Sequence, residues 1–166
     1  MAMETYNTIY VDPPLGFGNI RLEELHELPV SYFSAEDAML FLWFRSEELP
    51  ESLDVLENWG YRYVQVWSWM RGTVKTDYPY EHLVEHLLVG IRGTVRTDYV
   101  SRRNLFDCGR SEGPFHPQYF KEFALAAATR AFSPPRLLDM FGAFWQRRDQ
   151  DYREDNWHWW RGSLKY

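Results

Sequence analysis

The tetrapeptide Asp12-Pro13-Pro14-Leu15 directly follows a β-prone run, Tyr6 to Val11. Methylation of an adenine amino group requires acceptors that hold its two N–H groups and orient its lone pair, and a carboxylate with a backbone carbonyl can do this. Proline in second place stiffens such a loop and directs the preceding carbonyl outward. Leucine in fourth place leaves the loop without an aromatic ring that would stack on the base. Asp-Pro-Pro also marks ordinary turns, so the motif alone favours this chemistry only weakly.

A second carboxylate, Asp139, lies in the apolar run Arg136 to Phe141, which we predict to be a strand, and Gly142 follows it. Ligands of α/β sheets bind just beyond the carboxyl ends of the strands. The Asp-Pro-Pro motif and Phe141-Gly142 both fall at such ends. We therefore expect the two motifs to lie along one edge of a sheet.

The elements that would position these motifs alternate between strands and helices. Predicted strands cover residues 6–11, 39–44, 61–69, 82–91, 105–108 and 136–141, and predicted helices cover 21–28, 46–59 and 117–130. In the second helix, Ser46 is the expected N-cap and Gly60 the expected stop, and Leu49, Leu53 and Leu56 are expected on one face. The alternation predicts an α/β fold with a mostly parallel sheet flanked by helices.

The composition indicates one domain over residues 1–166. Aromatic residues make up 18% of the chain, which is too many for a disordered segment. The single cysteine, Cys108, excludes a disulfide framework and a cysteine zinc site, and it suits a reducing compartment. Neither a secretory signal nor a membrane span is expected, so we predict an intracellular protein, of the nucleus or the cytoplasm.

The charge of the chain is uneven. Residues 1–60 hold 12 acidic and 2 basic residues, a net −10, whereas residues 61–166 hold 12 acidic and 16 basic residues, a net +4. The first part is either a solvated acidic helical surface or a docking surface for a basic partner chain. A net charge of −6 argues mildly against a protein that binds nucleic acid alone.

An internal repeat adds a basic feature. The octapeptide at residues 71–78 recurs at residues 92–99 with seven of eight positions identical, Lys75 being replaced by Arg96. Each copy is either a connection that packs against a partner or a basic, tyrosine-tipped loop on a nucleic-acid backbone. In the second interpretation Arg71, Lys75, Arg92 and Arg96 bind phosphates.

Five stretches, taken in order, resemble the eukaryotic-type N6-adenine methyltransferase family, whose best-known members are the two subunits of the mRNA adenosine methyltransferase. The stretches are residues 11–15, 41–43, 59–62 with Trp67 and Trp69, 85–95 and 138–142. Together they cover nearly the whole chain and are far more specific than any one of them. The resemblance implies a Rossmann-like methyltransferase fold and S-adenosyl-L-methionine as the cofactor.

Carried over residue by residue, the resemblance implies roles for both carboxylates. Asp12 with Pro13-Pro14 would form the amine-binding catalytic loop, with Leu15 in the base-stacking position. Asp139 would bind the ribose hydroxyls of S-adenosyl-L-methionine, and Phe141 and Gly142 would line the same pocket, glycine permitting close backbone approach. His116 would stand where catalytic members place a lysine that contacts the cofactor.

The chain departs from the family pattern at several of these places. Leu15 replaces the stacking tryptophan, as in the non-catalytic subunit of the mRNA enzyme, although this chain keeps Asp12 where that subunit has glutamate. Ala143 replaces an arginine, Met70-Arg71-Gly72 replaces Lys-Thr-Asn, and residues 156–164 lack the terminal Gly-Asn-Gln or Gly-Asn-Glu. The chain also begins just before its first strand, whereas active relatives have an upstream segment that contacts the cofactor's adenine.

These departures favour a catalytically degenerate subunit, a pseudoenzyme that forms a heterodimer with a homologous catalytic subunit and helps to bind RNA or DNA. The alternative is an active S-adenosyl-L-methionine-dependent adenine N6-methyltransferase. An unrelated α/β domain with chance matches is a third possibility. The pair His82 and His86 lacks accompanying ligands, so no metal site is expected. Trp157, Trp159 and Trp160 are expected to be core or interface residues, with base stacking as the alternative.

Overall fold

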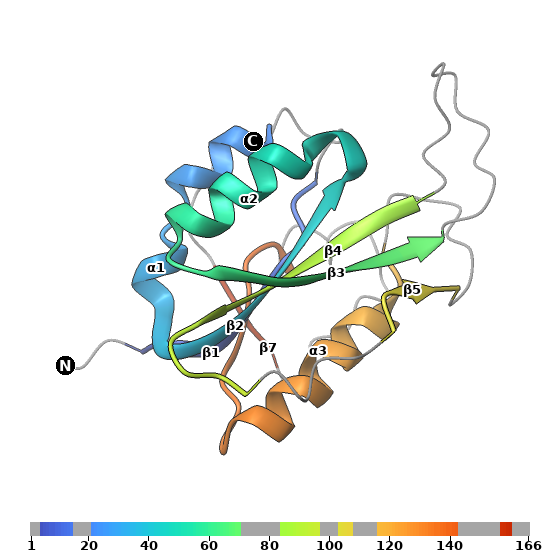
Figure 1. The fold of residues 1–166 in the computed structure, drawn as a ribbon. Coiled ribbons are helices and arrows are strands. Elements are labelled where there is room, and N and C mark those ends of the chain that lie inside the picture. Colours follow the sequence, from blue (N-terminus) through green and yellow to red (C-terminus); the bar gives the residue numbers. More distant parts are fainter. Residues whose placement is uncertain are drawn as a thin grey trace.

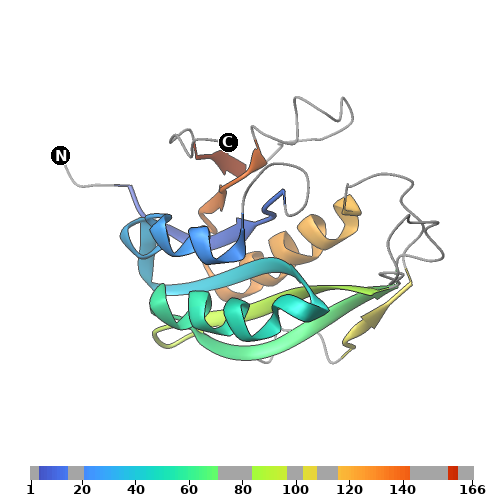
Figure 2. The ribbon, with the colours of Figure 1, turned by 90° about the horizontal axis from the view of Figure 1, so that it is seen from above.

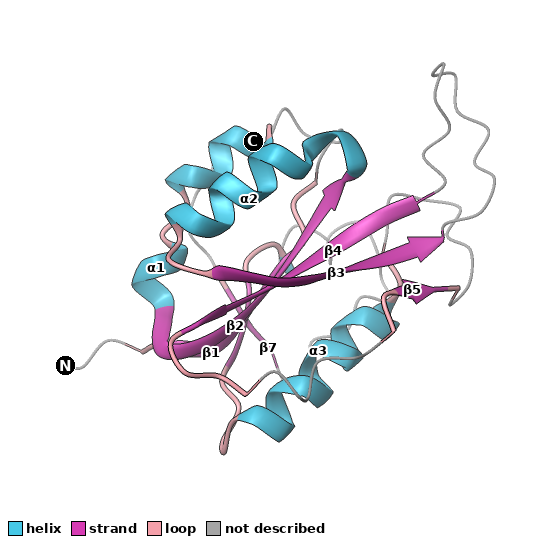
Figure 3. Ribbon diagram, viewed as in Figure 1, coloured by secondary structure: helices cyan, strands magenta, loops and turns pink. Residues whose placement is uncertain are grey.

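The described part of the chain forms a seven-stranded sheet with helices on both faces (Figures 1 and 3). The computed structural model describes residues 4–14, 21–70, 84–96, 103–107, 116–142 and 157–160. No helix within these ranges is long and apolar enough to cross a membrane.

The sheet is mixed but mostly parallel. Its strands, in the order β5-β3-β4-β2-β1-β6-β7, are Leu105–Phe106, Arg62–Met70, Val84–Arg92, Ser34–Arg45, Tyr6–Val11, Leu137–Asp139 and Trp157–Trp159. Four of the six pairings are parallel, and β4 runs antiparallel to both of its neighbours, β2 and β3. This arrangement confirms the predicted α/β class and a Rossmann-like methyltransferase fold.

Helices cover both faces of the sheet. Two helices, α1 (Val30–Phe33) and α2 (Leu49–Asn58), lie with the 3-10 helix η1 (Leu22–Glu27) on one face. The long helix α3 (Gln118–Ala131) lies on the other (Figure 2). A second 3-10 helix, η2 (Ser46–Glu48), joins β2 to α2.

Alternation along the central strands divides the core into two halves, one on each face of the sheet. In β1, Ile9 and Val11 pack toward α2, whereas Tyr10 packs toward α3. In β2, Leu40 and Leu42 pack toward α2, whereas Phe41 and Trp43 face α3. A strand buried on both faces needs apolar residues at every position, which explains the continuous apolar run predicted at residues 39–44.

The helix predicted at residues 46–59 differs from the expectation in its start and its buried face. Ser46 opens the short η2 turn and is not a cap, and α2 begins at Leu49. The buried side chains of α2 are Ser52, Val55 and Leu56, whereas Leu49 and Leu53 are exposed. Leu49, Leu53 and Leu56 all lie within α2 and share one side of it, but the face that packs on the sheet is turned toward Ser52 and Val55, so Leu56 is the one predicted residue that it includes. The predicted stop is confirmed, since Gly60 has a φ of 81°.

Other boundaries also differ. Strand β2 begins at Ser34, before the predicted start, and the segment predicted as a strand at 136–141 is regular only over Leu137–Asp139. Residues 22–27 are helical, but of the 3-10 type. Strand β7 (Trp157–Trp159) was not predicted, and it pairs in parallel with β6. Trp157 is buried in the core, as expected for the terminal tryptophans.

Candidate active site

The carboxyl ends of β1 and β6 lie side by side. These strands pair in parallel with Tyr10 opposite Asp139, and β2 flanks the other side of β1. The chain therefore adds strands to both sides of β1, which creates the kind of switch point where α/β sheets bind ligands. Asp12, just beyond β1, and Asp139, the last residue of β6, occupy this edge as expected.

The strand register directs the polar side chains at this edge toward α3. Tyr10 faces α3, so Asp12 two residues later lies on the same side. Glu85, near the start of β4, shares the side of Leu87 and Val89, which also pack under α3. Because β4 is antiparallel to β2, its first residues reach the edge that the last residues of β1 reach.

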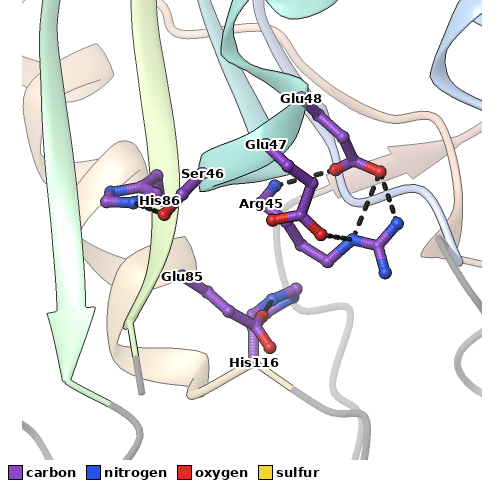
Figure 4. A network of polar contacts seen from close by, with 7 residues as sticks. All are labelled: Arg45, Ser46, Glu47, Glu48, Glu85, His86 and His116. Atoms are coloured by element: carbon purple, nitrogen blue, oxygen red, sulfur yellow. Dashed lines mark hydrogen bonds and ion pairs between the residues drawn. The ribbon is translucent and has the colours of Figure 1, made fainter. Parts of the chain in front are cut away.

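His116 joins Asp12 to Glu85. Its Nδ1 lies 2.8 Å from Oδ1 of Asp12, and its Nε2 contacts Oε2 of Glu85 (Figure 4 shows the pair with Glu85). His116 precedes Pro117, the N-cap of α3, so the start of the helix places the imidazole over the strand ends. Each ring nitrogen therefore faces one carboxylate, and the three side chains come from three separate parts of the chain.

The two carboxylates keep His116 protonated. Burial alone would lower the pKa of the imidazole, but the charges of Asp12 and Glu85 outweigh it and raise the pKa to about 10. Burial also raises the pKa of the Asp12 carboxyl, and the positive charge of His116 opposes that rise. At neutral pH both N–H groups of the imidazolium donate, one to Asp12 and one to Glu85.

Aromatic rings hold the imidazolium in place. The ring of Trp43 stacks on His116 with centroids 3.7 Å apart and planes 6° from parallel, and Trp69 meets the imidazole edge at 5.9 Å. The Trp43 indole N–H donates to the hydroxyl of Tyr10 over 2.6 Å. Burial and the charge of Asp12 raise the pKa of Tyr10 well above its ordinary value, so this hydroxyl stays neutral. The cation thus lies on an aromatic face, in a contact that is itself favourable.

Asp139 has charged and polar partners of its own. Its side chain is completely buried, and its Oδ2 lies 2.6 Å from the ammonium of Lys121. The backbone N–H of Phe141 donates to Oδ1 over 3.0 Å. The same ammonium lies 5.2 Å from the centre of the Trp157 ring. Helix α3, strand β6 and strand β7 therefore meet at one buried ion pair.

The structure describes most of the other residues that were predicted at this edge. Pro13 and Pro14 are buried beside Asp12, and Phe141 and Gly142 are buried just beyond Asp139. Leu15 lies outside the described residues. Cys108 and Ala143 also lie outside them.

Of the four residues predicted to bind nucleic acid, the structure describes Arg92 and Arg96. Arg71 and Lys75 lie outside the described residues, but β3 ends at Met70, paired with Val84 at the edge that holds Asp12. Arg92 ends β4 at the opposite edge of the sheet, and its guanidinium donates to the backbone carbonyl of Ser31 over 3.1 Å.

The second copy of the repeat is bonded to the body of the protein. Gly93 has a φ of 68°, and its carbonyl accepts from the Arg62 guanidinium over 3.0 Å. The backbone N–H of Thr94 donates to Asp37 over 2.7 Å. These bonds favour the interpretation of this copy as a structural connection, although Arg96 within the copy is exposed.

Two charged residues of the site were missed by the sequence reasoning, and both carried a detectable signal. Glu85 alternates with Leu87, Val89 and Ile91, so it stands at a buried position of a strand. Lys121 stands three residues before Ala124 and seven before Ala128, so it belongs to the buried face of α3. A charge at a position where the pattern demands an apolar residue indicates a buried partner.

A second polar group lies at the same edge, closer to the surface (Figure 4). His86 Nε2 lies 2.7 Å from Ser46 Oγ, and its Nδ1 lies 2.9 Å from Ser68 Oγ. Beside them, Arg45 pairs with Glu48 over 2.6 Å. Burial lowers the pKa of His86, so it is neutral at pH 7, in contrast to His116. Among the described residues, no group of His, Cys, Asp and Glu is arranged to hold a metal ion.

Comparison with known proteins agrees with this geometry. The model of the family described as MT-A70 matches residues 6–109, a segment that includes Asp12 and Glu85. His116, Lys121 and Asp139 lie beyond that segment.

Three relatives carry the name of methyltransferases. The "N(6)-adenosine-methyltransferase MT-A70-like" of Arabidopsis thaliana is 29% identical over 102 residues, which cover 53% of this chain and 15% of the relative. The "Probable N(6)-adenosine-methyltransferase MT-A70-like" of Oryza sativa subsp. japonica is 29% identical over 101 residues, covering 52% and 14%. The "Type II methyltransferase M.MunI" of Mycoplasma sp is 24% identical over 97 residues, covering 40% and 42%. The matches thus span less than half the length of each of these relatives.

Proposed function

The chain belongs to the MT-A70 family, and on this premise we propose that it is a catalytically degenerate subunit of a nucleic-acid adenine N6-methyltransferase. Its role would be to pack against an active homologous subunit and to help hold RNA or DNA. The names of the plant relatives support adenosine N6-methylation as the chemistry of the assembly.

The observation that carries the proposal is the pairing of Asp12 with His116. A carboxylate that is to orient the amino group of an adenine must have a free acceptor oxygen directed at the substrate. Here Oδ1 of Asp12 accepts from the imidazolium, the side chain is nearly buried, and Trp43 fixes the imidazole by stacking. An amine that binds Oδ1 of Asp12 would therefore compete with a buried, charge-assisted hydrogen bond, which is a costly step.

The residues present do not fit S-adenosyl-L-methionine, the methyl donor that MT-A70 methyltransferases generally use. A ribose diol needs an acceptor carboxylate that it can reach. Asp139 is completely buried, and each of its two oxygens already has a partner. As arranged, the chain has no accessible carboxylate at β6 for a ribose, so we derive no step through the cofactor.

The ionised side chains of the site instead contribute to a rigid sheet edge. His116 fixes the start of α3 to β1 and β4, and Lys121 fixes the same helix to β6. A rigid edge of this kind suits a subunit that orders the loops of a partner, because the surface it presents costs little entropy to bind. The acidic first part of the chain would then suit contact with a basic partner surface.

An active methyltransferase is the second candidate. It is favoured by the position of Asp12 and Asp139 on neighbouring parallel strands at a switch point, which is the arrangement that a substrate amine and a nucleoside cofactor would need. In that case His116 would have to leave Asp12 when the substrate binds.

Isothermal titration of the purified chain with S-adenosyl-L-methionine tests the proposal. We expect no binding at micromolar concentrations, and clear micromolar binding would contradict degeneracy. Transfer of a labelled methyl group to an adenine-containing oligonucleotide tests the second candidate, with Asp12→Ala as the matched variant. Transfer that Asp12→Ala abolishes would establish the active enzyme, whereas transfer that this variant leaves unchanged would exclude Asp12 as its centre.

The partner role needs its own experiment. We expect the chain to co-purify with a larger homologue that has an intact Asp-Pro-Pro-Trp motif, and to raise the methyl-transfer rate of that homologue. A homologue that is equally active with and without this chain would contradict the role.

A further inference from the structure

Lys121 is a buried lysine in the middle of an apolar helix face. It lies in the first turns of α3 between the core residues Phe120 and Ala124, and only 4% of its surface is exposed. Lysine is almost never buried to this degree unless a partner compensates its charge. The buried position of this ammonium therefore implies a specific partner for its charge.

That place is the carboxyl end of β6. The ammonium lies 2.6 Å from Oδ2 of Asp139 and faces the ring of Trp157 from β7. Rossmann-like sheets bind nucleosides beyond the carboxyl ends of strands at a switch point, and a carboxylate there accepts from a ribose hydroxyl. Asp139 stands at such a point, next to β1. Lys121 thus holds the oxygen that the architecture would otherwise offer to a ribose.

The same short segment supplies a cation to each of the acids at the ends of β1 and β6. His116, just before α3, donates to Asp12, and Lys121, one turn into α3, pairs with Asp139. A bound nucleoside would have to compete with an ammonium at Asp139, and an ionic hydrogen bond is about twice as strong as the neutral one from a hydroxyl. The competition therefore favours the lysine.

We propose that Lys121 is the residue that closes this chain to adenosyl ligands, because its ammonium occupies the Asp139 carboxylate in place of a ribose. The inference rests on the proposed function and extends it by naming the side chain that decides ligand selection. Removing the ammonium removes the competitor for Oδ2 of Asp139, and a flexible uncharged side chain in its place can move aside for a ribose, so such a variant gains affinity for adenosine-containing ligands.

The test is calorimetric titration of the full chain with S-adenosylhomocysteine, which contains the ribose but has no methyl group to transfer. The variants are Lys121→Met and, as a matched control, Arg130→Met, which removes an exposed cation from the same helix. We expect Lys121→Met to bind at least ~10-fold more tightly than the wild type, a difference of about 1.4 kcal/mol. Arg130→Met should bind like the wild type.

Thermal unfolding gives a second measurement. Lys121→Met leaves Asp139 buried without its cation, so its Tm should fall by roughly 10 °C, and S-adenosylhomocysteine should restore part of the loss. The double variant Lys121→Met/Asp139→Asn should recover stability without gaining affinity, because the acceptor charge is gone. If Lys121→Met does not fold, Lys121→Gln keeps an N–H donor without the charge and should gain affinity to a smaller extent.

The outcomes separate this inference from the proposed function. Equal affinity of the wild type, Lys121→Met and Lys121→Gln would overturn the role of Lys121. If all three fail to bind, the degenerate function stands while the role of Lys121 is refuted. If the wild type binds at micromolar concentration, degeneracy fails, and equal binding by the variants then refutes the role of Lys121 as well.

Discussion

Replacing His116 by glutamine would remove the cation that lies between two buried carboxylates. The pKa of His116 rises from 6.5 to about 10 on folding, which at 1.36 kcal/mol per pH unit corresponds to at most roughly 5 kcal/mol of stability. Removing one partner of a buried pair typically costs about 3–5 kcal/mol. We therefore expect His116→Gln to lower the free energy of unfolding at neutral pH by ~3–5 kcal/mol.

The loss should depend on pH in a defined direction. The folded protein holds the proton more tightly than the unfolded chain, so the stabilisation by His116 is fully present below pH 6.5 and disappears as the pH rises through about 10. The free energy of unfolding of the wild type should therefore decrease as the pH rises from 6.5 to about 10. The difference between wild type and His116→Gln should narrow over the same interval.

Urea unfolding followed by circular dichroism at pH 6.5, near 8 and near 10 measures this difference. His86→Gln is the matched control, because His86 lies at the same edge and also bonds through both ring nitrogens, but burial lowers its pKa. The change in the free energy of unfolding that His86→Gln causes should stay constant from pH 6.5 to about 10. A His116→Gln effect that is below ~1 kcal/mol, or that is as large near pH 10 as at pH 6.5, would refute the ion-pair reasoning.

Three further substitutions test the packing, each by the change in the free energy of unfolding measured in urea. Tyr10→Phe removes the acceptor of the Trp43 indole N–H and should cost ~1–3 kcal/mol; a neutral result would show that this hydrogen bond contributes nothing. Gly90→Ala brings a methyl group within 2.5 Å of the Leu56 side chain and should cost ~1–3 kcal/mol, whereas full stability would mean that α2 shifts freely. Leu56→Ala should cost ~2–5 kcal/mol and Leu53→Ala less than ~1, because Leu56 is 2% and Leu53 37% exposed; equal effects would contradict the buried face of α2.

The strands and the shared edge of the two acids were predictable from the sequence, because both depend on local patterns. A continuous apolar run indicates a strand buried on both faces, and β2 carries such a run, while β1 is a short β-prone run. Asp12 and Asp139 each follow or end such a run, and carboxyl ends of parallel strands meet at one edge. Length, alternation and the Asp-Pro-Pro motif were therefore sufficient to bring the two acids together.

The direction of β4, the strand β7 and the partners of the acids were not predictable in the same way. Strand direction depends on the connection between strands, and the apolar pattern of Val84–Arg92 is the same in either direction. Strand β7 has only three residues and is defined by its pairing with β6. Lys121 and Glu85 were visible as charges at buried positions, but only the tertiary structure shows which acid or base each one meets. The same is true of α2, whose buried face is turned from Leu49 and Leu53 toward Ser52 and Val55.

The reversed direction of β4 makes the site sensitive to how two strands are aligned. In the antiparallel pairing of β2 and β4, Glu85 lies opposite Arg45 at one end and Gly90 lies opposite Leu40, five pairs away. This register is what places Glu85 next to His116. Sliding β4 by one residue would turn His86 toward α3 and Glu85 toward α2, and sliding it by two would put Leu87 where the carboxylate now lies. A substitution in the middle of the β2–β4 ladder that shifts its register can therefore remove Glu85 from His116. The imidazolium would then lose one of its two carboxylates, although the substituted residue does not contact it.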